Sequence, residues 1–184
     1  MMISFLTGLY EIHLMMNFKI IFMPLVNDDH FLGYCSMICS VVAIIGAFIW
    51  GYLGDLKGVA FTILLLSILD FGSKIYSDFA VTKPMIVFMV ILIGLISKSM
   101  TTLAGPGFVE YFGLEVGTEL LPFKGIAILV GYLIVPFFQL ISASFLNPRG
   151  YLICISFASI VTLISSIRLY YIQRKNRKNE HVIP

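Results

Sequence analysis

The stretch Gly51–Gly58 reads GYLGDLKG and separates two long apolar runs of the chain. Residues 37–50 read MICSVVAIIGAFIW before it, and residues 59–69 read VAFTILLLSIL after it. Glycine adopts the backbone angles of a tight turn easily, and small residues let two helices approach closely. The charged residues Asp55 and Lys57 are costly to place in hydrocarbon. The pattern therefore predicts two apolar helices joined by a short polar turn at a membrane surface.

The composition of the whole chain supports this interpretation. Of 184 residues, 59% are hydrophobic and only 12% are charged, and the mean hydropathy is +0.99. A soluble domain has about a quarter of its residues charged, so the composition predicts an integral membrane protein. The net charge of +2 is small and the basic residues are grouped locally, which argues against a nucleic-acid partner.

Residues that usually carry chemistry are scarce in this sequence. The cysteines Cys35, Cys39 and Cys154 all lie in apolar runs, where cysteine behaves as a small hydrophobe. Their number and spacing predict neither a disulfide framework nor a metal site. The sequence also lacks a zinc-hydrolase motif, a nucleophile elbow and a phosphate-binding loop. We therefore expect no enzymatic activity and no cofactor.

Six segments are apolar over about 20 residues, the length that a helix needs to cross a bilayer. They are residues 2–24, 32–53, 59–76, 84–104, 117–140 and 150–172. Their apolar runs are continuous rather than alternating, which excludes a membrane β-barrel. The expected fold is all-α and polytopic, with six transmembrane helices in residues 1–173 and a basic tail in residues 174–184. The first segment contains several polar residues and starts at Met1, so we expect its helix to be clipped.

The placement of basic residues predicts the orientation of these segments. Five arginine and lysine residues lie between Arg168 and Lys178, and basic residues near the ends of spans remain on the cytoplasmic side. An even number of spans then places both termini and the Lys57 turn in the cytoplasm. The acidic residues 27–30, NDDH, face outward, while Lys83 and Arg149 are minor exceptions on that side.

With this topology, the Gly51–Gly58 stretch resembles the loop motif of the major facilitator superfamily. Gly51, Asp55, Lys57 and Gly58 match its glycines, aspartate and basic residue between the second and third helices of a six-helix half. The basic pair that usually follows is replaced here by valine and alanine. The resemblance implies that the four matching residues form a conformational latch, in which Asp55 braces one state against the opposite half.

Two further stretches resemble the monocarboxylate and oxalate/formate-antiporter branch of that superfamily. One is residues 26–32, VNDDHFL, and the other runs from Pro106 through residues 111–113, YFG, to residues 124–127, KGIA. Together the resemblances cover roughly residues 10–140 and liken the six segments to helices seven to twelve of a twelve-helix carrier. They imply three partners: a small carboxylate substrate, the lipid bilayer and a second six-helix half.

Lys124 is the residue that the resemblance assigns to substrate binding. It lies in residues 119–135, ELLPFKGIAILVGYLIV, roughly 10 Å into the fifth span. An ammonium group within a membrane needs an anion, a carbonyl or a water-filled cavity; the alternative is that Lys124 reaches the cytoplasmic headgroups. Ala47 stands where the oxalate/formate branch has an arginine, which favours a monocarboxylate over a dicarboxylate substrate.

Two other titratable residues are candidates for proton coupling. Asp70 lies four residues before Lys74 and on the same helix face, so mutual neutralisation is the structural alternative that we favour. His13 titrates near neutral pH, and its alternative is a position at the shallow end of a helix. We interpret the NDDH residues as a solvated loop that caps the second helix, rather than as metal ligands.

The leading hypothesis from the sequence is transport of a small monocarboxylate across a membrane by alternating access. The alternative, from a different class, is a membrane subunit or truncated carrier without transport activity of its own.

Overall fold

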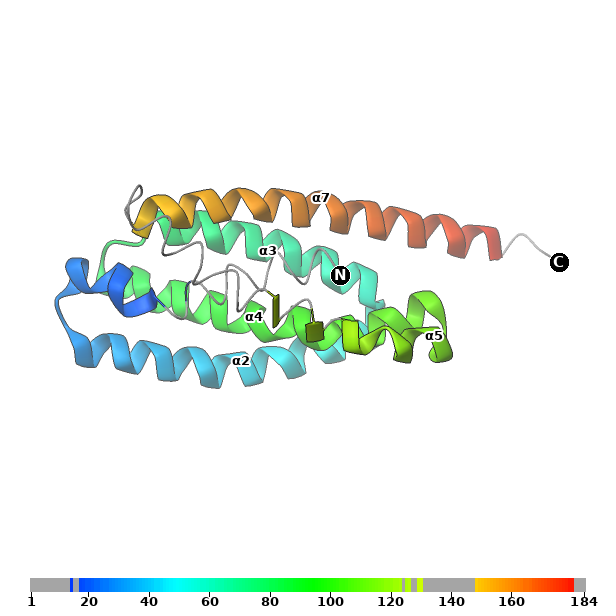
Figure 1. Cartoon of the computed structure of the whole chain (residues 1–184), viewed down its shortest axis with the longest axis horizontal. Coiled ribbons are helices and arrows are strands. Elements are labelled where there is room, and N and C mark those ends of the chain that lie inside the picture. The colour runs from blue at the N-terminus through cyan, green and yellow to red at the C-terminus, as the bar shows by residue number, and fades with distance from the viewer. Residues whose placement is uncertain (1–13, 15–16, 124, 127–128, 131–147, 181–184) are drawn as a thin grey trace.

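The computed structural model describes residues 14, 17–123, 125–126, 129–130 and 148–180. Within this part of the chain the regular structure is entirely helical, which confirms the predicted all-α class (Figure 1). A first helix covers Asn17–Val26. It is followed by α2 (Asp29–Lys57), α3 (Val59–Phe79), α4 (Lys83–Phe112), α5 (Leu114–Glu119) and α7 (Pro148–Glu180).

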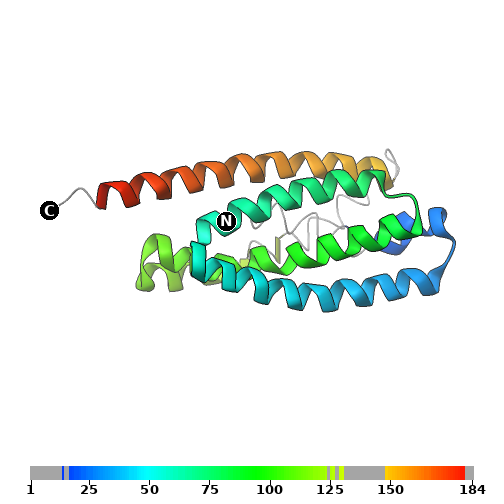
Figure 2. The same ribbon diagram turned by 180° about the vertical axis from the view of Figure 1, so that it is seen from behind.

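The four long helices lie side by side along the longest axis of the molecule (Figures 1 and 2). Helix α4 packs against both α2 and α3, and the other face of α3 packs against α7. Glycines make the α2–α4 contact close, because a Cβ at Gly94 would lie 2.8 Å from the Cys39 carbonyl oxygen and one at Gly46 would collide with the Leu95 carbonyl. Small residues of this kind are what close packing between membrane helices requires.

The turn between α2 and α3 is a single residue, Gly58. Its φ of 89° lies in the region that only glycine adopts without strain, and its N–H donates to the Gly54 carbonyl at 2.9 Å. The predicted tight turn is therefore confirmed. The predicted end of the second helix at residue 53 is too early, because α2 continues through Lys57 and includes Asp55 in its last turn.

The largest boundary error concerns residues 105–115, which the sequence indicated as a connecting loop. Helix α4 instead continues through Pro106 and ends only at Phe112, where Gly113 has a φ of 80° and donates its N–H to Val109. A proline inside a helix removes one backbone hydrogen bond. The helix nevertheless continues, since its extension packs Gly107 against Val59 and places Glu110 beside the start of α3.

The last two predicted spans also differ in their bounds. The fifth, predicted at 117–140, begins inside the short helix α5, which ends at Glu119. Residues 121–123, 125–126 and 129–130 are helical, and residues 124, 127–128 and 131–140 lie outside the described residues. The sixth, predicted at 150–172, is α7, which continues to Glu180. The basic tail expected from residue 174 onward is thus helical as far as Glu180.

Among the residues that the structure describes, two helices, α2 and α3, are long and apolar enough to cross a membrane, judged by length and composition alone. The segments Asn17–Val26 and Lys83–Ile96 are apolar but shorter. Buried helices of soluble proteins can meet the same criterion, so it gives only weak evidence of a membrane. That the other four predicted segments cross a membrane stays a prediction.

The end of the bundle opposite the Gly58 turn is closed by ion pairs. Asn27, with a φ of 48°, precedes Asp28, which caps α2 by accepting the Phe31 N–H at 3.0 Å. Lys83 at the start of α4 donates to Asp28 at 2.6 Å, and Lys19 lies 2.7 Å from Asp29. The capping role predicted for this loop is confirmed.

The Asp28 contacts predict an acid-sensitive helix end. The hydrogen bond from Lys83, followed by that from the Phe31 N–H, lowers the pKa of Asp28 below its ordinary value of 3.8. Stabilisation by a carboxylate with a lowered folded-state pKa is complete above the unfolded-state pKa and is lost as the pH falls through the folded-state pKa. We expect the melting temperature of the purified protein to fall between about pH 5 and about pH 3, and to fall less in Asp28→Asn.

Asp55→Asn, which alters an exposed carboxylate at the other end of α2, serves as the control. An acid-induced decrease that is equal in wild type and Asp28→Asn would contradict the assigned role of the Asp28 cap.

Candidate functional site

Nine of the ten buried polar residues that the structure describes belong to α3 and α7, two helices that pack against each other. We call this set the polar seam: it consists of buried residues of α3 and α7, namely Thr62, Ser67, Asp70, Ser73, Lys74, Ser77, Ser159, Thr162 and Ser166. Elsewhere in the described core the buried residues are mainly apolar. Buried polar groups are costly unless they are hydrogen-bonded, so their partners decide what the seam can do.

The hydroxyl groups of the seam are satisfied largely by their own helices. Ser67 donates to the Ile63 carbonyl at 2.8 Å, and Ser166 donates to the Thr162 carbonyl at 2.8 Å. The two serine oxygens are also 2.7 Å apart, which joins α3 to α7. Each hydroxyl has one proton, so two protons are shared among these three contacts.

The only charged groups among the seam residues form an ion pair with each other. The Lys74 ammonium lies 2.6 Å from the Asp70 carboxylate, with side-chain exposures of 1% and 12%. Ser73 and Ser77 donate to the Asp70 and Lys74 carbonyls, at 2.8 and 2.7 Å. The mutual neutralisation predicted from their spacing is confirmed. Charges inside an apolar protein persist when they are paired in this way.

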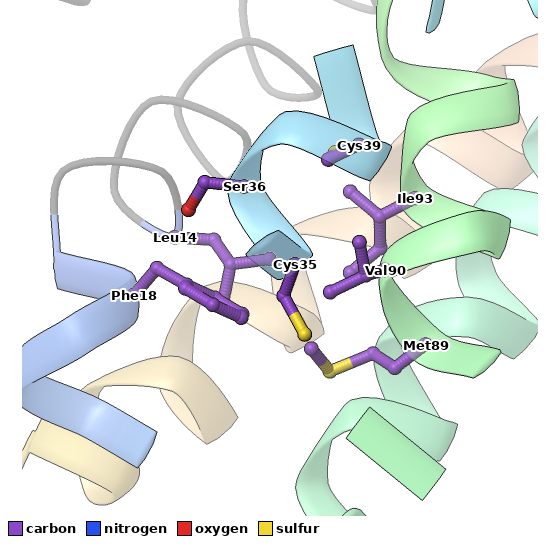
Figure 3. A pocket seen from close by; sticks show the side chains of 8 residues that line it. All are labelled: Leu14, Phe18, Cys35, Ser36, Cys39, Met89, Val90 and Ile93. Carbon is purple, nitrogen blue, oxygen red and sulfur yellow. The ribbon is translucent and has the colours of Figure 1, made fainter. Parts of the chain in front are cut away.

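A second candidate is the cavity between the Asn17–Val26 helix, α2 and α4 (Figure 3). Its lining is mainly apolar and includes, among the described residues, Leu14, Phe18, Cys35, Ser36, Cys39, Met89, Val90 and Ile93. Its volume is about 10 Å³, which is close to the smallest space that holds one water molecule. A carboxylate substrate would not fit there.

The predicted latch residues lie together at the opposite end of α2, but not in the arrangement that we expected. Asp55 and Lys57 are exposed, and a Cβ at Gly51 would meet no atom within 4 Å. The expected position of Asp55 in the polar turn between the second and third segments is wrong. Because α2 continues to Lys57, Asp55 occupies a C-terminal turn, where the helix dipole favours a cation such as Lys57.

Glu110 supplies the carboxylate that the start of α3 needs. One of its oxygens accepts the Val59 N–H at 3.2 Å, and the other accepts a hydrogen bond from the Gln173 side chain of α7. One residue later, the Tyr111 hydroxyl donates to the Leu169 carbonyl at 3.3 Å. Two consecutive residues of α4 therefore join α3 and α7.

The sequence reasoning missed Glu110 because the residue was placed in a loop, where a carboxylate is unremarkable. Glu110 lies two residues before Phe112, where α4 ends, which is about half a helical turn. A prediction that continued the helix through Pro106 would have shown a lone acid on a helix beside the α2–α3 turn.

Three predicted site residues remain to be placed. Lys124, the predicted substrate ligand, and His13, a coupling candidate, lie outside the described residues. Ala47, at the position of the absent arginine, is half-buried in α2. Among the described residues no group of three or more histidine, cysteine, aspartate or glutamate side chains could hold a metal ion.

No family profile matches this chain, and neither the curated proteins nor the solved structures include a significant match.

The Asp70–Lys74 pair predicts a non-additive pair of substitutions. Lys74→Met leaves a buried carboxylate without its ammonium, so we expect unfolding in detergent to become easier by about 3–5 kcal/mol. Asp70→Asn should destabilise for the same reason. The double variant removes both charges together and should recover most of the loss, because replacing a complete buried ion pair is often neutral. A double variant whose loss equals the sum of the single losses would contradict direct pairing.

The Glu110 contacts predict local loosening at two helices. Glu110→Ala removes the acceptor for the first amide of α3, so we expect a stability loss of about 1 kcal/mol, as for other helix caps. Hydrogen exchange of the Val59 amide should become faster, and a double-mutant cycle with Gln173→Ala should show coupling. Glu115→Ala, an exposed glutamate of α5, should change neither measurement. Unchanged Val59 exchange in Glu110→Ala would contradict the contact.

Proposed function

We propose that this chain is a membrane-embedded helical bundle that forms one half of a carrier for a small monocarboxylate. The observation that carries the proposal is the large apolar surface of the bundle together with an ion pair buried inside it. Large apolar side chains are exposed on the outside, and the Asp70–Lys74 pair lies in an otherwise largely apolar interior. In water this arrangement would expose a large apolar surface, which marks a membrane or protein contact.

Helix α2 shows the exposed apolar surface most clearly. Only 28% of the 18 residues in its most apolar stretch are buried within the bundle. Its exposed large side chains include Tyr34, Met37, Val41, Ile44, Ile45, Phe48, Ile49 and Tyr52. Lipid covers such a surface without cost, and a second helical half would cover part of it.

Three features support a carrier over other membrane proteins. Charged residues held inside a membrane bundle commonly mark a path for a solute or an ion, and Asp70 and Lys74 are such residues. The one-residue turn at Gly58 agrees with the tight, glycine-dependent loop of the carrier motif. Asp55 is exposed beside this turn, so its carboxylate is accessible to an opposite half.

In the proposed mechanism, the bundle rocks against a second half around a site near the middle of the membrane. Lys124 attracts the substrate carboxylate, and its single charge suits a monocarboxylate. Asp55, with Gly51, Lys57 and Gly58, stabilises one of the two end states through contact with the opposite half.

A second candidate function is that of a membrane subunit without transport activity. The favouring observation is that Asp70 and Lys74 neutralise each other at 2.6 Å, which leaves this pair no net charge for a substrate. The replacement of the arginine by Ala47 supports the same alternative.

The proposed topology predicts that the two ends of the bundle face opposite sides of the membrane. With the native cysteines replaced by serine, a single cysteine at Asn27 should react with an impermeant reagent only from outside. A cysteine at Asn179 should react only after permeabilisation, because the basic end of α7 remains in the cytoplasm. Labelling of both positions from the same side would contradict the six-span topology.

The transport proposal is tested by Lys124→Met in proteoliposomes. Uptake of a radiolabelled monocarboxylate should decrease about 10-fold or more, as expected for the loss of one charge-assisted hydrogen bond. Lys98→Met removes a lysine from the exposed side of α4 and should leave uptake unchanged. Equal uptake by wild type and Lys124→Met would exclude Lys124 as the substrate ligand. No uptake by the wild-type chain, alone or with a partner half, would favour the non-transporting subunit.

A further inference from the structure

The C-terminal part of α7 has a surface groove that none of the roles above uses. Among the described residues it is lined by Tyr170, Tyr171, Arg174 and Lys175, and its volume is about 320 Å³. Helix α7 extends past the other helices at this end of the bundle (Figure 2). The groove therefore lies at the end that carries the Gly58 turn and the predicted cytoplasmic surface.

Along α7, the two tyrosines of the lining come before the two basic residues. This arrangement is suited to a membrane–water boundary. Arg174 and Lys175 follow Tyr171 by three and four positions, so all three side chains lie on one face of the helix. Tyrosine rings concentrate at the level of lipid headgroups. A guanidinium group binds phosphate oxygens through two parallel hydrogen bonds, and an ammonium group adds a point charge. The described lining of the groove thus contains two cations and two phenol groups.

An apolar stripe leads along α7 to this groove. Ile160, Ile164, Ile167 and Tyr171 are all exposed, and their spacing of four, three and four residues places them on one helix face. Ten residues separate Ile164 from Arg174, which corresponds to about 15 Å along the helix. This length is about half of the hydrocarbon core of a bilayer, that is, one leaflet.

The groove is held in position by contacts of α7 with two other helices. The Tyr170 ring lies 6.2 Å from the Phe61 ring of α3, centroid to centroid. The Tyr111 hydroxyl donates to the Leu169 carbonyl, and Gln173 donates to Glu110. These contacts fix the backbone of α7 around residues 169–173, so ligand binding has to order only the side chains of Tyr171, Arg174 and Lys175.

We propose that Tyr171, Arg174 and Lys175 bind the phosphate of an anionic phospholipid whose acyl chain lies along Ile160, Ile164 and Ile167. The apolar stripe decides between a lipid and a free phosphate ion, since only a lipid uses both parts of the surface. This inference rests on the membrane location in the proposed function and does not depend on transport.

The test is native mass spectrometry of the full chain in detergent micelles, with phosphatidylglycerol, phosphatidylcholine or inorganic phosphate added. We expect a phosphatidylglycerol adduct that survives detergent removal, and much less of the other two. The double variant Arg174→Gln/Lys175→Gln should weaken phosphatidylglycerol binding at least about 10-fold. Lys19→Gln/Lys83→Gln removes two cations at the opposite end of the bundle and should have no effect.

A second variant separates lipid from free phosphate. Ile164→Ser shortens the apolar stripe and should weaken phosphatidylglycerol binding while leaving the two cations intact. Equal binding of phosphatidylglycerol and phosphatidylcholine would overturn the proposal. So would retention of the adduct in Arg174→Gln/Lys175→Gln, or binding of inorganic phosphate as tight as that of the lipid.

Membrane insertion is measured separately, by resistance of the chain to carbonate extraction from vesicles. A resistant chain without a specific phosphatidylglycerol adduct would overturn only the lipid site. A chain that carbonate extracts from the vesicles would overturn the membrane location in the proposed function, and this inference with it.

Discussion

The Glu110 carboxylate is the contact on which one whole end of the bundle depends. Its two oxygens accept hydrogen bonds from the first amide of α3 and from Gln173 of α7. The four N-terminal amides of a helix have no partner within the helix, so an acceptor from elsewhere is needed. Glu110 provides it from α4 and at the same time fixes α7, whose next residues are the cations of the surface groove. A single side chain thus couples the α2–α3 turn to the basic surface.

The interior of the bundle follows a second constraint, which is that polar groups away from water must be paired. The seam meets it in two ways: serine and threonine hydroxyls bond to carbonyls one turn earlier, and Lys74 bonds to Asp70. Both solutions use groups within one helix, so they are complete before helices associate. The contact between Ser67 and Ser166 is different, because it exists only when α3 and α7 are side by side. It therefore contributes to the choice of neighbour rather than to helix formation.

The two ends of the bundle differ in how they hold the chain. At the Asp28 end, exposed ion pairs join Lys83 to Asp28 and Lys19 to Asp29. Exposed pairs are individually weak and are screened by salt. At the Gly58 end, a glycine turn and the Glu110 contacts hold the helices. These rely on backbone conformation and on hydrogen bonds to a carboxylate, so salt affects them less.

The sequence by itself determined the helical class, the approximate positions of the helices, the Gly58 turn, the Asp28 cap and the Asp70–Lys74 pair. Each of these is local: apolar length, a residue with positive φ, a capping side chain and a spacing of four residues on one helix. Only the tertiary structure decided the course of α4 through Pro106, the role of Glu110 and the exposed position of Asp55. The reason is that these depend on contacts between residues about 50 to 60 positions apart, and no local pattern records which carboxylate will meet a helix start.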